Sequence, residues 1–260
     1  AASVEPEFQE ITWTVSTATI TGTSALAGQP FTLTKSQAGG ATCTLTNNVV
    51  ASLSKSDPGL AANWLRSGSF AIPQAGDDVI LRDCAVPILY NLTALAAVAF
   101  ASFQRWGSFT GQIGLPVNNE AGYREYRPTR LQFIGSGTLV MTLGMGQGDG
   151  PPLERYDQIG QRVNLDVSSG NVVEWISTHV SSTVRVQGAV VNVAMDTGEV
   201  ATIASGLIDG GGQINLGQGV TLSGTLTLNN AGATLYCAGT VVASNSSTLT
   251  IASLAVTHAA

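Results

Sequence analysis

Carboxylate side chains are the residues of this chain whose chemistry we consider first, because two carboxyl groups about 5–10 Å apart can hydrolyse a glycosidic bond. Asp149, Glu154 and Asp157 lie within residues 144–161, a polar stretch rich in Gly and Pro. No partner stands at a fixed spacing from any of the three. A solvated loop is therefore the simpler interpretation, although long connections of this kind are usually functional, mobile or placed at a subunit contact.

Further carboxylates come together only if the chain winds into coils. Neighbours across coils of a solenoid would be about 21 residues apart. Asp157 with Asp166 and Glu174, or Asp196 with Glu199, approach this arrangement only loosely. Asp77 and Asp78 could form a carboxylate pair or bind calcium, but Asp bonds its own backbone in turns, which explains them more simply. The coils also contain too few basic residues for a lyase site. We therefore assign no catalytic residue.

Cysteine and histidine give no metal or redox signature. Cys43, Cys84 and Cys237 are odd in number, lie far apart and match no zinc or redox spacing, so we expect buried, small apolar side chains. The two histidines, His179 and His258, are too few for a His-rich metal site, and we expect His258 in solvent. We therefore expect no metal and no cofactor.

The densest run of unusual residues is 107–131, GSFTGQIGLPVNNEAGYREYRPTRL. It contains four glycines, two prolines, two tyrosines and three arginines, in a chain of which 11 % is charged. Glycine permits backbone angles that are closed to other residues and proline fixes φ, so we expect an ordered loop. Arg124, Glu125 and Arg127 can form short ion pairs within it.

The composition predicts a folded, all-β protein. Gly, Ser, Thr, Val and Ala dominate, and hydrophobic residues make up 44 % of the chain. The net charge is −6 and no Lys or Arg follows Val186, so we expect no nucleic-acid partner. The most apolar run, residues 89–103, is interrupted by polar residues and predicts a buried segment, not a membrane span. No basic region followed by an apolar region opens the chain, so we expect no signal peptide.

From Arg162 to the end, apolar residues recur at intervals of about 21 residues, which is a repeat length typical of solenoids. The columns are Leu165, Val186, Leu207, Leu228 and Leu249; Val172, Val193, Ile214 and Leu235; Met195, Leu216 and Cys237; and Val220 with Val241. Repeats of this kind, built from short strands, predict a solenoid. In a β-solenoid each coil stacks on the one before it at the ordinary strand spacing of about 4.8 Å, and such columns fill the interior.

We therefore predict a right-handed parallel β-helix over residues 51–260, with about 21 residues per coil. It comprises an opening motif at residues 60–82, the 107–131 loop and regular coils over residues 162–255. The C-terminal run STLTIASLAVTHAA is apolar and has no polar cap, and an uncapped last coil should pair with another chain. We therefore expect a multimer, with a homotrimer as the working assumption, or docking onto a larger body.

Residues 1–50 predict a small β module. Ile11, Trp13 and Val15 alternate with threonines, as in a strand, and residues 18–34, ATITGTSALAGQPFTLT, predict two short strands around Gly28 and Pro30. The opening EPEFQE is polar, and it is either an extended arm that pairs with a neighbouring subunit or a frayed end. The module is a candidate contact with a capsid or with another subunit.

A resemblance to a known family lies within residues 25–135. It is carried by Asn63, Trp64, Gly68, Ile72, Pro73 and residues 76–80, 88–90, 109–111, 113–116, 122–123 and 125–127, preceded by a similar segment at 28–47. These motifs resemble those of right-handed β-helix proteins on the virion surface of tailed phages of the cyanophage-like type. The resemblance implies a β-helix on the particle exterior, as a capsid cement or decoration knob, a fibre or a spike.

The function that the resemblance implies is structural. A non-enzymatic cement or decoration protein would bind the major capsid protein through residues 1–50, stabilise the shell and present residues 130–260 as a knob. Two alternatives stay open: a tail spike that cleaves polysaccharide through the carboxylates above, and an adhesin that binds a host surface glycan through exposed aromatic residues. The aromatic candidates are Trp106, Tyr123, Tyr126, Tyr156 and Trp175, although core or loop packing is the simpler interpretation of each.

Overall fold

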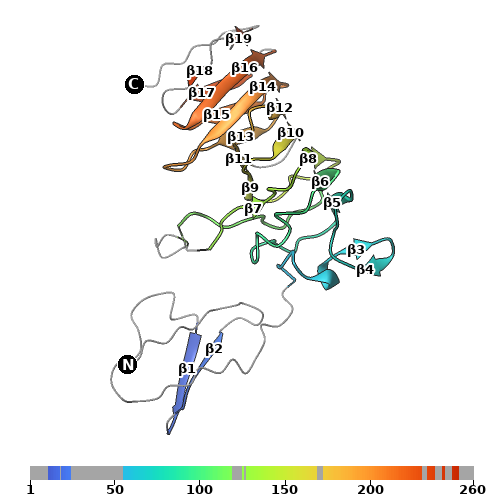
Figure 1. Ribbon diagram of the computed structural model, residues 1–260, viewed down its shortest axis with the longest axis vertical. Coiled ribbons are helices and arrows are strands. Elements are labelled where there is room, and N and C mark those ends of the chain that lie inside the picture. The colour runs from blue at the N-terminus through green and yellow to red at the C-terminus, as the bar shows by residue number, and fades with distance from the viewer. Residues whose placement is uncertain are drawn as a thin grey trace.

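The computed structural model of the chain describes residues 11–17, 19–24, 55–118, 125, 127–168, 172–229, 233–237, 242–243 and 248–251. Most of its strands are parallel and stack into a β-solenoid of about 7 turns with ~22 residues per turn (Figure 1). The predicted parallel β-helix is therefore confirmed, and a small antiparallel β module precedes it in the chain, as predicted. Within these residues the one helix is a 3-10 turn, η1 (Ala61–Asn63), and no helix is long and apolar enough to cross a membrane.

Two parallel sheets form the flanks of the solenoid. The larger sheet runs in the order β18-β16-β14-β12-β10-β8-β6-β5, with β19 also on β16, and the smaller runs in the order β17-β15-β13-β11-β9-β7. The strands of the larger sheet are β5 (Asp78–Leu81), β6 (Ser102–Trp106), β8 (Thr138–Met145), β10 (Arg162–Val167), β12 (Thr183–Gln187), β14 (Ala201–Asp209), β16 (Val220–Leu228), β18 (Val242–Ala243) and β19 (Thr248–Ile251). The strands of the smaller sheet are β7 (Leu131–Gln132), β9 (Glu154–Gln158), β11 (Val173–Ser177), β13 (Val190–Val193), β15 (Gln213–Leu216) and β17 (Thr234–Cys237).

Two antiparallel hairpins complete the described strands. β1 (Ile11–Ser16) pairs with β2 (Thr19–Ser24), and β3 (Leu65–Arg66) pairs with β4 (Ser69–Phe70). The predicted strand that begins at Ile11 is therefore confirmed. Of the two strands expected within residues 18–34, the first is confirmed as β2, and the second, after Pro30, lies outside the described residues, as does the polar segment 1–10.

The turn before β5 shows why the sequence places two aspartates together. The Asp77 carboxylate accepts the Gln74 backbone N–H at 2.8 Å and pairs with Arg66 at 2.6 Å. Asp78 instead begins β5, is exposed and accepts the Ser102 hydroxyl at 2.6 Å. Asp77 therefore caps a turn, as predicted, and Asp78 bonds to the adjacent strand β6.

The interior changes character along the solenoid. In the N-terminal coils it is aromatic: the rings of Phe103 and Phe133 have centroids 5.1 Å apart, and those of Phe133 and Tyr156 are 6.5 Å apart. From β12 onward the interior is aliphatic, with Val191 and Ile214 among the residues that are 0 % exposed. Because each layer packs on the next, this interior fixes the outward positions of the alternate residues.

The predicted period is correct as a mean and wrong as a strict register. One aligned column of the larger sheet contains Val167, Val186, Ile208, Leu228 and Ile251. The number of residues between successive members is unequal: the first separation is the shortest and the last is the longest. Leu207 aligns with the exposed Arg185 and faces outward, and Leu165 and Leu249 belong to a different column from Val186. Turns of unequal length cause these shifts, and a shift of one residue moves a side chain to the opposite face.

The predicted columns of the smaller sheet are likewise correct in part. Two pairs align as predicted: Ile214 with Leu235, and Leu216 with Cys237. Val193 aligns with Leu216 instead of Ile214, and Val172 and Met195 are 37 % and 39 % exposed, so these three are misplaced in the predicted columns. Val241 lies outside the described residues.

Two adjacent substitutions test this register. Ile208→Ala should lower the free energy of unfolding by about 2–5 kcal/mol, because it leaves a cavity in an interior position that is 0 % exposed. Leu207→Ala, one residue away on the outer face, should change it by less than about 1 kcal/mol. Urea unfolding followed by circular dichroism measures both, and a larger loss for Leu207→Ala would contradict the observed register.

Candidate functional site

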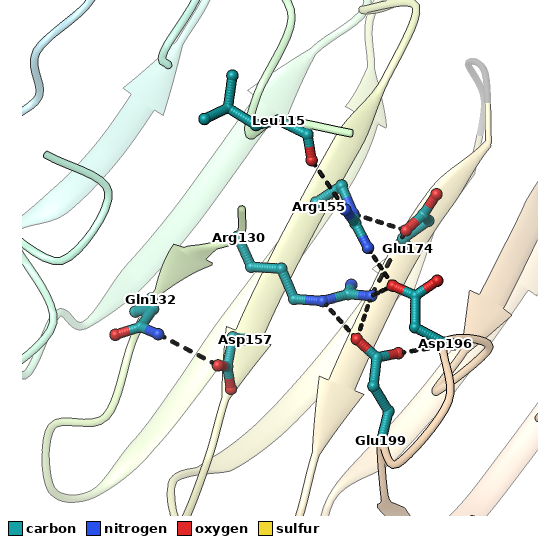
Figure 2. A network of polar contacts seen from close by, with 8 residues as sticks. All are labelled: Leu115, Arg130, Gln132, Arg155, Asp157, Glu174, Asp196 and Glu199. Carbon is teal, nitrogen blue, oxygen red and sulfur yellow. Dashed lines mark hydrogen bonds and ion pairs between the residues drawn. The ribbon is translucent and has the colours of Figure 1, made fainter. Parts of the chain in front are cut away.

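Charged side chains gather on the outer face of the smaller sheet (Figure 2). Arg130 immediately precedes β7, and Arg155 lies in β9, where the register places it beside Glu174 of β11. The turn that follows β13 brings Asp196 and Glu199 to the same place. We call these five residues the ionic cluster. It exists only once the coils are stacked, because its members are spread over residues 130–199.

Arg130 is the residue of the ionic cluster with the most partners. Its Nε and Nη2 donate to Glu199 Oε1 at 3.0 and 2.7 Å, and Nη2 also lies 3.2 Å from Asp196 and 3.5 Å from Glu174. The side chain is 7 % exposed. A charge so far removed from water is stable only when paired, so these carboxylates hold Arg130 in place.

Arg155 ties the 107–131 loop to the same cluster. Its Nη2 donates to Asp196 at 2.5 Å and its Nη1 donates to the backbone carbonyl of Leu115 at 2.8 Å (Figure 2). Its Nε lies 2.7 Å from Glu174 in an ion pair that lacks the direction of a hydrogen bond. The side chain is 2 % exposed. The cluster therefore fastens the loop to the coils of β9, β11 and β13.

The backbone of the next coil packs closely against the backbone of Glu199, a member of the cluster. A Cβ added to Gly219 would overlap the Glu199 carbonyl oxygen, far inside van der Waals contact. The Gly219 carbonyl in turn accepts the Ala201 N–H at 3.1 Å. Glycine is therefore required at this turn, because the coil that carries Glu199 could not stack otherwise.

Within the 107–131 loop, one of the predicted ion pairs is present. Arg127 Nη2 lies 2.9 Å from the Glu125 carboxylate, which confirms one of the expected ion pairs, whereas Arg124 lies outside the described residues. A Cβ added to Gly111 would overlap the Val86 carbonyl oxygen of the preceding segment, which explains the glycine there by close approach.

Asp157 lies at the border of the cluster, on the outer face of β9. Its carboxylate accepts the Ile159 backbone N–H at 3.1 Å and the Gln132 side-chain amide at 3.4 Å (Figure 2). Burial raises the pKa of Asp157 above its ordinary value; the Ile159 N–H and Arg130 oppose the increase, and the Glu199 carboxylate adds to it. Asp157 is thus a carboxyl group that holds its proton more firmly than an exposed one.

The structure sorts the carboxylates that the sequence singled out. Three of them converge: Glu174, Asp196 and Glu199. Asp157 lies beside them, but Asp166 does not, because it is on the larger sheet and pairs with Arg185 at 3.3 Å. Asp149 is exposed in the turn between β8 and β9. The set Asp157, Asp166 and Glu174 is therefore wrong, and the pair Asp196 and Glu199 is part of a larger group.

The sequence predicted a solvated loop at Glu154, and this prediction is wrong. Glu154 lies in β9, and its side chain points into the solenoid. It accepts two hydrogen bonds from the Arg105 guanidinium, one of them from Nε at 3.0 Å, and one from the Tyr156 hydroxyl at 2.8 Å. All three residues are 0 % exposed. Burial raises the pKa of Glu154 against the opposing effect of Arg105, and it raises the pKa of Tyr156 well above its ordinary value. This enclosed group stabilises the interior and cannot meet a substrate.

The described residues contain no group of three or more His, Cys, Asp or Glu side chains arranged to hold a metal ion. Cys84 and Cys237 are free thiols; Cys84 is half-buried, and Cys237 is exposed, which contradicts the expected burial. In the register of β17, Cys237 aligns with the buried Leu216 of β15, although Cys237 itself is exposed. Cys43 and His258 lie outside the described residues, and His179 accepts a backbone N–H within its own turn at 3.1 Å.

Two of the aromatic candidates for glycan binding lie in the core, which confirms the simpler interpretation for them. Tyr156 and Trp175 are 0 % exposed and belong to the interior, so neither can contact a sugar. Trp106 is half-buried beneath the Arg82 guanidinium, whose carbon lies 5.4 Å from the ring centroid. The tyrosines at positions 123 and 126 lie outside the described residues.

Chemically, the ionic cluster links a loop and several coils by charge-assisted hydrogen bonds, which are stronger than neutral ones. Its two arginines were not singled out from the sequence. The sequence feature that could have identified them is spacing. Arg130 precedes Arg155, and Arg155 precedes Glu174, by roughly the length of a single coil. Comparison of the chain with protein-family models, curated proteins and solved structures gives no match.

Removing one arginine from the cluster should be costly. Arg155→Met should lower the free energy of unfolding by about 2 kcal/mol or more, because it leaves carboxylates without their buried partner. Arg185→Met is the matched control: it breaks the exposed pair with Asp166, whose side chains are 44 % and 37 % exposed, and should cost less than about 1 kcal/mol. Equal losses in urea unfolding would contradict a special role for the cluster.

The raised pKa of Asp157 predicts a pH dependence of stability. Because its pKa is higher in the folded state than in the unfolded state, the folded protein holds the proton more firmly, and stability falls as pH rises from about 4 through the folded-state pKa. Asp157→Asn removes this fall. The free energy of unfolding of the variant relative to the parent should therefore increase from pH 3 to pH 7, and a difference that is constant with pH would contradict the assignment.

Proposed function

We propose that the protein is a non-enzymatic structural protein of a virion, a capsid cement or decoration knob on the exterior of a tailed-phage particle. In this proposal it binds the major capsid protein and further copies of itself, as a homotrimer, and it stabilises the shell. A rigid solenoid suits this role, because each coil is held by its neighbours and the whole resists bending.

The observation that carries the proposal is the ionic cluster. Where the described coils gather carboxylates on one face, two arginines that are 7 % and 2 % exposed bind them. Catalytic carboxylates must reach a substrate, whereas these carboxylates reach arginines and fasten the 107–131 loop to the coils. The arrangement therefore supports a mechanical role.

The opening motif that carries the family resemblance adds support. Trp64 Nε1 donates to the Pro58 carbonyl at 2.7 Å, and Asn63 Nδ2 donates to the Asp57 carbonyl at 2.7 Å. These bonds hold the segment before β3 folded at the start of the solenoid. The resembling residues thus form a structural turn, which is compatible with the β-helix that the resemblance implies.

A polysaccharide-cleaving tail spike is the second candidate, and one observation favours it. Glycoside hydrolysis pairs a carboxyl group that keeps its proton with one that is ionised. Asp157, whose pKa is raised, lies close enough to Glu199 for that carboxylate to contribute to the increase. Under this alternative, Asp157→Asn would abolish cleavage of a surface polysaccharide and leave the fold intact.

Localisation on particles decides between the two. We expect gold-labelled antibodies against the protein to label the whole shell of the phage that encodes it, and the copy number per particle to follow that of the major capsid protein. A few copies confined to the tail would favour the spike instead. Particles without any label would contradict the virion assignment itself.

A further inference from the structure

The N-terminal end of the larger sheet has an open edge. β5 is the last strand in the order of this sheet, and among the described strands it pairs only with β6 (Figure 1). The opposite edge of β5 therefore presents backbone N–H and C=O groups to which no described strand is paired. Such an edge is the place where a further strand can add to a sheet.

A groove of about 740 Å³ follows this edge. All four residues of β5 line it, together with Trp64, Leu65 and the interior side chains of Ile88 and Phe109. The groove thus combines a free strand edge with a lining that is partly apolar. These are the two features by which proteins bind an extended segment: main-chain hydrogen bonds give affinity, and side-chain pockets give specificity.

The lining favours an uncharged occupant with an apolar face. Three cations and three anions line it and balance in charge: Lys55, Arg66, Arg82, Asp57, Asp77 and Asp78. Arg66 and Asp77 pair at 2.6 Å. Leu65 and Ile80 are 74 % and 44 % exposed, which is a large apolar area to leave in water. A charged peptide would gain little from this groove, whereas an apolar strand would cover both side chains.

The hairpin of β1 and β2 has the matching chemistry. Residues 11–24 contain no charged side chain. The register sets Val15 opposite Ile20 and Trp13 opposite Gly22, so three large apolar side chains share one face, and they are 72 %, 68 % and 40 % exposed. No further described strand pairs with this hairpin, and a two-stranded hairpin alone is marginally stable in water, so its apolar face is suited to a partner.

We propose that the hairpin of a second copy of this chain occupies the groove and adds a strand to the free edge of β5. Among the described residues nothing covers the hairpin face or the groove, and their mutual burial would join two chains. The contact uses a different surface on each copy, and it closes into a ring when the rotation between copies permits. This inference specifies the self-association within the proposed function, and it is tested in solution, without a particle.

Light scattering coupled to size-exclusion chromatography tests the contact on the full chain. We expect the parent protein to be a multimer. Val15→Lys on the hairpin face and Ile80→Lys in the groove should each reduce the mass to that of one chain, 26.7 kDa. Thr14→Lys, on the opposite hairpin face, and Val140→Lys, which is 46 % exposed on the same sheet but does not line the groove, are the matched controls and should leave the multimer intact.

A mixing experiment separates loss of the contact from loss of folding. A Val15→Lys chain keeps its groove and an Ile80→Lys chain keeps its hairpin, so an equimolar mixture should form a complex of two chains although each variant alone is a single chain. A parent protein that is a single chain, a multimer that survives both variants, or a mixture that stays dissociated would each overturn the proposal. Any of these results would leave the virion location to be decided by the labelling of particles.

Discussion

Backbone pairing between parallel strands of successive coils is the constraint on which the rest of this structure depends. Because every strand takes its register from the coil before it, one residue more or less in a turn decides which side chains face inward. The ionic cluster follows from this pairing: Arg155 stands beside Glu174 because β9 and β11 are in register, not because the two are close in sequence. The buried arginines then make the pairing hard to alter, since any shift would separate charges that have left water.

The sequence allowed the solenoid, its mean repeat and the N-terminal strand to be predicted, because apolar periodicity and turn residues are local signals. It did not allow the register to be predicted, because coils of unequal length average to a repeat that few single coils have. Leu207 shows the result: it fits a predicted interior column and yet faces outward.

The site was predictable only in its acidic half. Glu174, Asp196 and Glu199 drew attention as carboxylates, but the arginines that bind them come from a loop and from a stretch that resembled a solvated connection. Part of that stretch is β9, in which all five residues are buried. A polar sequence can form an interior strand there because its buried polar side chains bond to one another: Arg105, Glu154 and Tyr156. The sequence gives no direct sign of this pairing, because Arg105 and Glu154 are 49 residues apart.

The change of the interior from polar and aromatic to aliphatic bears on the accuracy of folding. In the N-terminal coils Arg105 meets Glu154 in one alignment only, because a slip of two residues would bury two unpaired charges. In the later coils Val, Ile and Leu occupy equivalent positions, and the same slip would exchange one aliphatic side chain for another. The N-terminal coils therefore set the strand register for the later coils, and errors of register would arise toward the C-terminal end.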